Sequence, residues 1–391
     1  MLTAALWIAF VFVLLVLMEL LRLNVLLFRA LTTEPRLPEL GNSQLDNPHP
    51  LVTIVVPAKD EAASIEASVR SMLASDYRNL EIILVNDRSE DGTLQIMERL
   101  ASEEPRIKVI SIEELPPEWT GKTHAMYKAA QEASGDVLLF TDADAFLDPR
   151  AISHVLRFFK ARNLDMLSLL PGFVKRGFNE NAVHPHMALG ISYFYPLTDV
   201  NDPAKEAALA SGCFIMISRQ AYEKLGTWEK FRNEVTEDVA LSKAAKANGL
   251  KLVVMRGTGL VCTKPFESVS DMCRFWKRTY YGGLEKSVYK LARLVMNYVF
   301  LSLMILLFAI SGFFIITGRG ELPTVALFTV SLLAMAAVVI PFSIFISHEE
   351  GDWIYGLASP VGVFVGLFVS LSTLLTVLTN EGIQWRGSTY R

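Results

Sequence analysis

The sequence has 391 residues, of which 51% are hydrophobic and 20% are charged, and its formal net charge is −4. This length allows two or three structural units, and the nearly balanced charge favours neither a nucleic-acid-binding protein nor a disordered charged tail. Cys213, Cys262 and Cys273 lack metal-ligand spacing and are odd in number, so we interpret them as packing residues in a reducing compartment.

The chain begins with an apolar run, residues 2–21, that contains one acidic residue, Glu19, and is long enough to cross a bilayer. No basic segment precedes the run and no small-residue cleavage site ends it, so a membrane anchor over residues 1–30 is favoured over a cleaved signal peptide. Arg22 and Arg29 follow, and the positive-inside rule therefore predicts that the next segment is cytoplasmic.

Strand and helix patterns alternate between residues 48 and 265. Near-continuous runs of β-branched and other apolar residues at 51–57, 81–85 and 137–141 predict strands buried on both faces of a parallel sheet. Apolar residues at helical spacing lie between these runs. The pattern predicts one α/β domain with a Rossmann-like, mostly parallel sheet.

Polar clusters at residues 59–61, 86–91 and 142–144 each follow one of the predicted strands. In such sheets, ligands bind beyond the carboxyl ends of the strands. Asp142 and Asp144 are two residues apart and share one face, so their charges repel unless a cation lies between them. The cation that suits such ligands is Mg²⁺ or Mn²⁺, completed by substrate phosphates. A turn or helix-capping role is the alternative for each aspartate.

The ligand expected at this edge is a nucleotide-sugar. Neither a Gly-x-Gly-x-x-Gly fingerprint nor a P-loop sequence occurs in the chain, which argues against a dinucleotide or a P-loop nucleotide. Acidic residues at strand ends suit the hydroxyls and ring N–H of a nucleoside together with a metal-bound diphosphate.

The second half of the domain is less regular. Residues 165–170 and a glycine-led run at 210–219 predict further strands, and a helix begins near residue 237. The aromatic residues of segment 171–204 are interpreted as core residues, with an apolar acceptor groove as the alternative. His184 and His186 have a metal-like spacing, but a structural role is favoured for both.

The C-terminal region contains three apolar runs, at residues 294–316, 322–346 and 354–378, which predict about three transmembrane helices within residues 293–380. Residues 266–292 are basic and amphipathic and predict an interfacial segment. Three crossings from the cytoplasm would place the basic and aromatic tail, residues 381–391, outside, where the positive-inside rule does not expect it. Either one run is re-entrant or the rule does not hold here.

Five short motifs resemble those of the family 2 glycosyltransferases, in the family's order and spacing. They read VVPAKDE at 55–61, VNDRSEDGT at 85–93, GK at 121–122, TDAD at 141–144 and TED at 236–238. The resemblance implies a GT-A fold, a nucleotide-diphospho-sugar donor (a UDP-sugar first, a GDP-sugar second), a divalent metal, and inversion by single displacement.

The resemblance also implies roles on the donor side. Pro57 and Glu61 would shape the donor pocket, and Asp87 would accept from a uracil-type base. Lys122 would lie near the nucleotide. Asp142 would face the ribose and diphosphate, and Asp144, with Asp142, would hold the metal.

On the acceptor side, the resemblance implies that Asp238, next to Glu237, is the general base, and that Gly212 lies in the stretch lining the acceptor. A capping charge at the start of a helix is the alternative reading for these acids. Many processive and lipid-modifying members carry Gln/Arg-x-x-Arg-Trp before their membrane segments, whereas residues 271–278 here read DMCRFWKR. The resemblance assigns Arg274 to the donor phosphates and Trp276 to the acceptor. The Arg and Trp are spaced differently here than in the family motif, which argues against a processive synthase.

We therefore expect a cytoplasm-facing, integral cell-membrane enzyme with transmembrane helices at both ends, which transfers a sugar to the hydroxyl of a carotenoid, hopanoid, ceramide or glycerolipid. The loop 116–122 and the segment 385–387 resemble most the carotenoid- and hopanoid-associated glycosyltransferases. The alternative enzyme is a polyprenyl-phosphate glycosyltransferase. A non-catalytic membrane scaffold or transporter is disfavoured because the membrane runs carry almost no ionisable residues at mid-depth.

Overall fold

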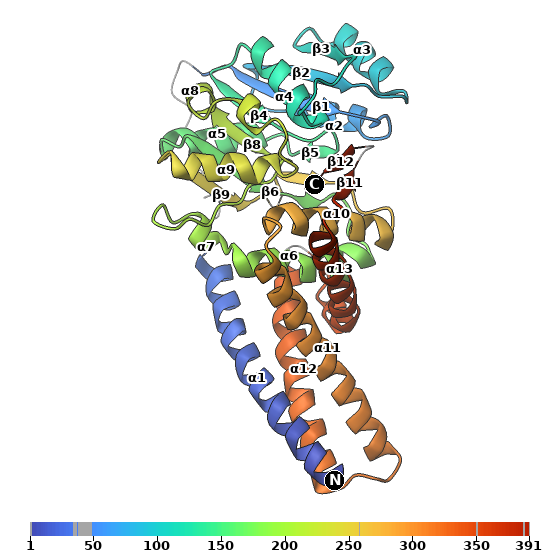
Figure 1. Cartoon of the computed structure of the whole chain (residues 1–391). Coiled ribbons are helices and arrows are strands. Elements are labelled where there is room, and N and C mark those ends of the chain that lie inside the picture. Colours follow the sequence, from blue (N-terminus) through green and yellow to red (C-terminus); the bar gives the residue numbers. More distant parts are fainter. Residues whose placement is uncertain are drawn as a thin grey trace. The chain divides into compact units, whose positions relative to one another are not determined.

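The computed structural model of the chain describes residues 2–33, 37, 49–257, 259–348, 351–385 and 388–390. It divides into two compact units (Figure 1). The α/β unit comprises residues 34–175 and 195–264, and the helical unit comprises residues 1–33, 176–194 and 265–391. Part of the predicted α/β segment, residues 176–194, thus packs with the helical unit.

A seven-stranded sheet in the order β3-β2-β1-β4-β8-β6-β9 forms the centre of the α/β unit. Its strands are β1 (Val52–Ala58), β2 (Leu80–Asp87), β3 (Ile107–Ile112), β4 (Val137–Phe140), β6 (Met166–Leu170), β8 (Ile215–Ser218) and β9 (Leu252–Arg256). Neighbouring strands are parallel except that β8 runs antiparallel to both β4 and β6. The predicted α/β class with a mostly parallel sheet is confirmed.

Helices and a small second sheet complete this unit. The helices are α2 (Ile65–Leu73), α3 (Thr93–Glu103), α4 (Gly121–Glu132), α5 (Ala151–Ala161), α7 (Leu197–Val200), α8 (Arg219–Lys224), the 3-10 turn η2 (Trp228–Phe231) and α9 (Glu237–Ala247). The second sheet has the order β5-β10-β7, with β5 (Ala145–Leu147), β7 (Gly172–Phe173) and β10 (Val261–Thr263). The predicted strand at 210–219 is shorter than expected, because residues before Ile215 form a turn.

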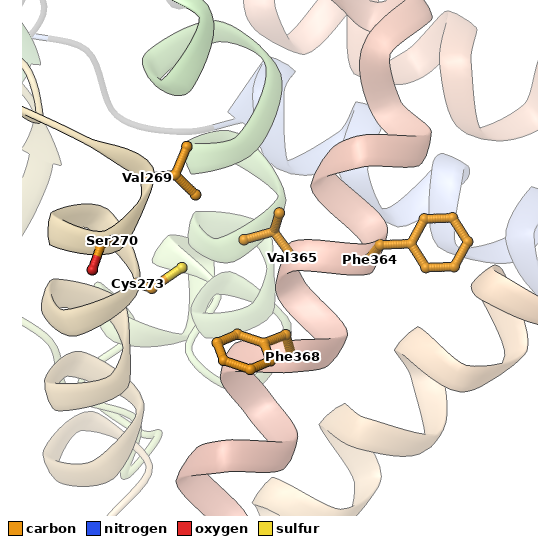
Figure 2. Close-up of a pocket in the computed structure, with 6 residues that line it drawn as sticks. All are labelled: Val269, Ser270, Cys273, Phe364, Val365 and Phe368. Carbon is orange, nitrogen blue, oxygen red and sulfur yellow. The ribbon is translucent and has the colours of Figure 1, made fainter.

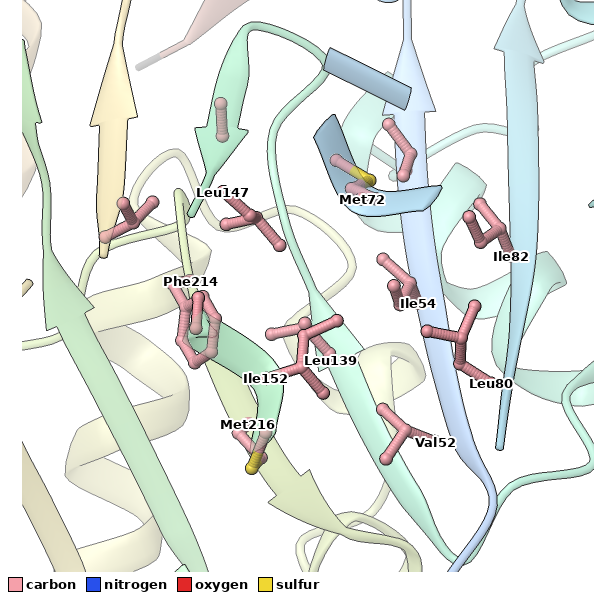
Figure 3. Close-up of a cluster of buried hydrophobic side chains, with 14 of the residues drawn as sticks. Val52, Ile54, Met72, Leu80, Ile82, Leu139, Leu147, Ile152, Phe214 and Met216 are labelled. Carbon is pink, nitrogen blue, oxygen red and sulfur yellow. The ribbon is translucent and has the colours of Figure 1, made fainter. Parts of the chain in front are cut away.

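The main apolar core lies on one face of the large sheet (Figure 3). Alternate residues of β1, Val52 and Ile54, point into it together with Leu139 of β4, and Met72 of α2 and Ile152 of α5 cover them. All of these side chains are at most 1% exposed. The strands that carry the site residues are therefore fixed by close packing, which places their carboxyl ends reproducibly.

Long helices dominate the other unit. Its elements are α1 (Leu2–Thr33), the π-helical turn η1 (Asn179–Val183), α6 (His184–Phe194), α10 (Val269–Gly283), α11 (Val288–Ile316), α12 (Leu322–His348), the 3-10 turn η3 (Trp353–Ala358), α13 (Ser359–Thr379), β11 (Ile383–Trp385) and β12 (Ser388–Tyr390). Figure 1 shows α1, α11 and α12 running alongside one another. Their shared core includes Val13, Met304 and Leu327.

Within the described residues, three helical stretches are long and apolar enough to cross a membrane: Val288–Ile316, Leu322–Ser347 and Trp353–Thr379. They correspond to the three predicted C-terminal runs. The apolar part described for α1 is shorter, Ala4–Met18, so the N-terminal anchor stays a prediction. The predicted interfacial segment, residues 266–292, belongs to two helices. Helix α10 ends at Gly283, and residues 288–292 are the first residues of α11. Residues 386, 387 and 391 of the predicted tail lie outside the described residues.

Candidate active site

The carboxyl ends of β1, β2 and β4 lie at one edge of the sheet. The register pairs Pro57 with Val85 and Val55 with Phe140, so the three strands end close to one level. The amide of Thr141 still donates to the carbonyl of Val55 at 3.1 Å, which extends β4 toward Asp142. The polar clusters predicted at these ends therefore share one edge, as expected for parallel strands.

The loop after β1 is held by the loop after β2. The buried hydroxyl oxygen of Thr93 accepts from the amide of Glu61 at 2.8 Å, and Asp91 Oδ2 accepts from the amide of Ala62 at 3.0 Å. The Glu61 carboxylate is buried and lies 3.7 Å from Lys264 Nζ. Asp91 and Thr93 thus fix the backbone beside Glu61, a bracing role that the local sequence did not reveal.

Asp87, at the end of β2, is buried against the start of α4. Arg88 Nε donates to Asp87 Oδ1 at 2.8 Å. A Cβ added at Gly121 would overlap Asp87 Oδ2, so the first residue of α4 must lack a side chain for Asp87 to keep this position. Because a short carboxylate side chain has little freedom to move away, Gly121 and Asp87 form a matched pair.

Lys122 contacts acidic residues from two separate parts of the chain. Its Nζ lies 2.6 Å from Asp142 Oδ1, after β4, and 2.7 Å from Glu237 Oε1, at the start of α9. Gly212 lies beside it, since a Cβ there would come within 2.6 Å of Lys122 Nζ. Two acids that the sequence assigned to opposite substrates are therefore bridged by one ammonium group.

The electrostatics of this bridge are strong. Burial opposes the positive charge of Lys122, but Asp142, Glu237 and Asp238 outweigh it and raise the pKa of the lysine above its ordinary value. Lys122 therefore stays protonated throughout the physiological range. A fixed positive charge beside a diphosphate site stabilises negative charge there without a proton transfer.

Asp238 lies at the N-terminus of α9 and accepts two main-chain hydrogen bonds. The amide of Gly212 donates to Asp238 Oδ2 at 3.0 Å, and the amide of Val239 donates to Oδ1 at 2.8 Å. Burial and then the charge of Glu237 raise the pKa of Asp238 to about 6, while Lys122 and the two amides act in the opposite direction. A carboxylate poised this close to neutrality suits a general base.

Asp142 and Asp144 both act on Cys213. The thiol Sγ donates to Asp142 Oδ2 at 3.4 Å, and burial, then Asp142 and Asp144, raise the pKa of Cys213 well above its ordinary value. Both carboxylates therefore lie close enough to the thiol to act on it electrostatically. Among the described residues none of the three cysteines is in a disulfide, and Cys213 lies at the site rather than in remote packing.

Asp142 and Asp144 are the candidate ligands for a divalent cation. Among the residues that the structure describes, no three His, Cys, Asp or Glu side chains are grouped so as to hold a metal. Two carboxylates that both act on the Cys213 thiol nevertheless fit Mg²⁺ or Mn²⁺, which commonly take one or two protein carboxylates and complete their shell with phosphate oxygens and water. In the structure Lys122 contacts Oδ1 of Asp142, and the Cys213 thiol donates to its Oδ2.

The remaining predicted residues lie in the helical unit. Arg274 is exposed on α10, and its Nη1 donates to Ser270 Oγ at 3.1 Å. Trp276 is only 5% exposed, with its ring 5.1 Å from that of His184 and 5.7 Å from that of Tyr280. Their assigned roles at the donor and the acceptor stay predictions.

His184 and His186 pack against aromatic rings of the helical unit. Besides the contact of His184 with Trp276, the ring of His186 stacks on Phe342 with centroids 3.7 Å apart. Burial lowers the pKa of both histidines to about 3, so both are neutral at physiological pH. This arrangement agrees with the structural role favoured from the sequence.

Residues 53–226 match the family model described as glycosyl transferase family 2. A "Beta-monoglucosyldiacylglycerol synthase" of Synechocystis sp. is 26% identical over 226 residues, covering 57% of this chain and 46% of that protein. An "Uncharacterized glycosyltransferase" of Haemophilus influenzae is 26% identical over 117 residues, covering 30% of this chain and 45% of that protein. The chain spans about half the length of the curated relatives it matches.

A solved structure has a similar fold over nearly its whole length. The mannosyltransferase PcManGT from Pyrobaculum calidifontis, in complex with GDP-Man and Mn²⁺, superposes with a TM-score of 0.52 at 16% identity, covering 95% of this chain and 99% of that one. At this identity the likeness concerns the fold alone. The sequence of residues 53–226 thus matches the glycosyl transferase family 2 model, and the α/β unit has a GT-A-like fold.

Proposed function

We propose that the chain is an inverting, metal-dependent glycosyltransferase that moves a sugar from a nucleotide-diphospho-sugar to the hydroxyl group of a membrane lipid. The observation that carries this proposal is the bridge of Lys122 between Asp142 and Glu237, with Asp238 beside it. One ammonium group links the acids that follow a sheet strand to those that begin α9. A donor and an acceptor bound at these acids would meet in one place.

On the donor side, Asp142 and Asp144 would hold the cation, and Glu61, Asp87 and Pro57 would line the nucleoside pocket. When bound, Mg²⁺ or Mn²⁺ neutralises negative charge that develops on the departing nucleoside diphosphate. Lys122 adds a second, permanent positive charge within 2.6 Å of Asp142 Oδ1. It also keeps Asp142 oriented before the donor arrives, which lowers the reorganisation needed on binding.

On the acceptor side, Asp238 takes the proton of the acceptor hydroxyl while its oxygen attacks the anomeric carbon. The new carbon–oxygen bond forms as the bond to the diphosphate oxygen breaks, and the electron pair leaves with the nucleoside diphosphate. The amides of Gly212 and Val239 hold the Asp238 carboxylate in place for this transfer. A positioned base of this kind typically contributes about 10²–10⁴ in rate.

A lipid acceptor is supported by two observations. Three helical stretches of the described chain are long and apolar enough to cross a bilayer, and a relative aligned over 57% of this chain is named for the synthesis of a glucosyl lipid. We infer an integral cell-membrane protein whose α/β unit faces the cytoplasm, where nucleotide-sugars are available. The donor is a UDP-sugar or a GDP-sugar.

Mass spectrometry of lipid extracts tests the proposal. Extracts from cells that express the full chain should contain a glycosylated lipid that is missing from cells without the gene and from cells that express Asp238→Asn. Lipid profiles identical in all three cultures would contradict the proposal. A glycosylated polyprenyl phosphate that persists in Asp238→Asn cells would instead support the alternative acceptor, whose phosphate needs little help from a base.

A further inference from the structure

An open cavity of about 470 Å³ lies between α10 and α13 in the helical unit (Figure 2). Six residues line it, three from each helix: Val269, Ser270 and Cys273, and Phe364, Val365 and Phe368. The size is typical of a small-ligand site. The lining is apolar except at the Ser270 hydroxyl and the Cys273 thiol.

The apolar walls of this groove are exposed. Phe364 is 41% exposed, Phe368 is 65% exposed and Val269 is 44% exposed. Phe364 and Phe368 belong to α13, which lies in one of the three candidate membrane spans. A groove whose wall is a membrane-spanning helix opens toward hydrocarbon, so an apolar chain is the chemistry that would cover it.

The polar end of the groove carries positive charge. Arg274 Nη1 donates to the hydroxyl of Ser270, one of the lining residues, at 3.1 Å. Asp271 Oδ1 lies 3.6 Å from Arg274 Nη2 and offsets part of this charge, while Lys277 and Arg278 follow one turn later on α10. Basic residues on an interfacial amphipathic helix attract anionic headgroups.

The groove residues of α10 lie beside a buried stripe of the same helix. Met272, Trp276 and Tyr280 recur every four residues and are buried in the helical unit, whereas Val269 and Ser270 are exposed. An apolar groove with the Arg274 guanidinium at one end matches a lipid that has a hydrocarbon chain and a phosphate in its headgroup.

We propose that the groove between α10 and α13 binds one hydrocarbon chain of an anionic phospholipid of the bilayer, with the lipid phosphate at Arg274 and the Ser270 hydroxyl. The site holds a lipid that is retained rather than consumed, and the proposal gives Arg274 this role in place of the donor-phosphate role predicted from the sequence. It would fix α10 against α13 at the membrane surface.

Native mass spectrometry of the full-length protein in detergent tests this site directly. The protein is titrated with dioleoyl phosphatidylglycerol or with dioleoyl phosphatidylcholine, and bound lipid is counted. We expect phosphatidylglycerol to bind more tightly, by about fivefold for each basic side chain that contacts the headgroup. Equal retention of the two lipids would overturn the headgroup assignment.

Variants locate the binding. Val365→Trp fills the groove and should lower the affinity for phosphatidylglycerol several-fold, whereas Val325→Trp, the same change at an exposed position of α12 outside the groove, should leave it unchanged. Ser270→Ala, at an exposed position where folding is not at risk, should reduce the preference for phosphatidylglycerol over phosphatidylcholine. Wild-type lipid binding in both Val365→Trp and Ser270→Ala would overturn the proposal, whatever the transfer activity of the protein.

Discussion

The two halves of the α/β unit are built in different ways. In the first half, residues 52–147, parallel strands end at one edge and hydrogen bonds between neighbouring loops hold the polar residues. In the second half, residues 165–256, an antiparallel strand interrupts the order and the N-terminus of a helix presents Glu237 and Asp238. Lys122, from the first half, contacts Glu237 of the second.

In the proposed function the two halves have separate roles, and Lys122 connects them. The first half would form the donor platform, since its strands pack in the main core and its loops are hydrogen-bonded to each other. The second half would supply the base, Asp238, whose pKa is set by burial and by neighbouring charges. Because Lys122 of the first half lowers the pKa of Asp238 in the second, a substitution in the first half should change the pKa of the proposed base.

The largest effect is expected from removing the base in the second half. Asp238→Asn should lower turnover with a hydroxyl acceptor by about 10²–10⁴ and leave the KM for the nucleotide-sugar nearly unchanged, because the donor platform stays intact. Steady-state kinetics in membranes measure both constants. Glu98→Gln, at an exposed position of α3, is the control. A loss of less than about threefold would exclude Asp238 as the base.

The second largest effect is expected from replacing Lys122, which bridges Asp142 and Glu237. Wild-type turnover should rise as the pH increases through about 6, because Asp238 must lose its proton to act as a base. Lys122 lowers the pKa of Asp238, so Lys122→Met should reduce turnover and move this acidic limb to higher pH.

A pH profile of turnover for both proteins checks this coupling. Lys128→Met, which removes an exposed lysine from the same helix, should keep the wild-type profile. An unshifted limb in an otherwise folded Lys122→Met protein would mean that Lys122 does not act on Asp238.

Smaller effects on KM and turnover are expected from replacing Gly121 in the first half and Gly212 in the second. Gly121→Ala would push against the carboxylate of Asp87, so it should raise the KM for the nucleotide-sugar. Gly212→Ala would push against Lys122 Nζ, the end of a flexible side chain, and should lower turnover more than it raises this KM. The ratio of the two constants in each variant measures the contrast. Identical kinetic changes in the two variants would refute separate donor and acceptor sides.

The smallest effect is expected in the loop brace. Thr93→Val leaves the buried amide of Glu61 without its acceptor, at a cost of about 1–3 kcal/mol in the free energy of unfolding. Tm should fall, the KM for the donor should rise a few-fold, and the pH profile should stay in place. Thr329→Val, at an exposed position of α12, provides the control. A Tm equal to that of the wild type would show that the hydrogen bond between Thr93 and the Glu61 amide does not stabilise the fold.

Much of the first half could be predicted from the sequence because its signals are local. Continuous apolar runs predicted the bounds of β1, β2 and β4 to within two residues, and the polar residues that follow these strands lie at the strand ends where expected. In contrast, nothing local shows that Lys122 contacts Glu237, because that contact depends on how distant elements fold together. The apolar run at 210–219 likewise carries no information about strand direction, so the antiparallel β8 could not be foreseen.

Release of nucleoside diphosphate from UDP-sugars and GDP-sugars tests whether Asp142 and Asp144 hold a cation that the transfer requires. Membranes containing the full chain, supplied with Mg²⁺ or Mn²⁺ and lipid extract, should release the diphosphate from one donor, and a chelator or Asp144→Ala should abolish the release. Release that is equal in wild type, in Asp144→Ala and in the presence of chelator would contradict a cation held at the aspartate pair.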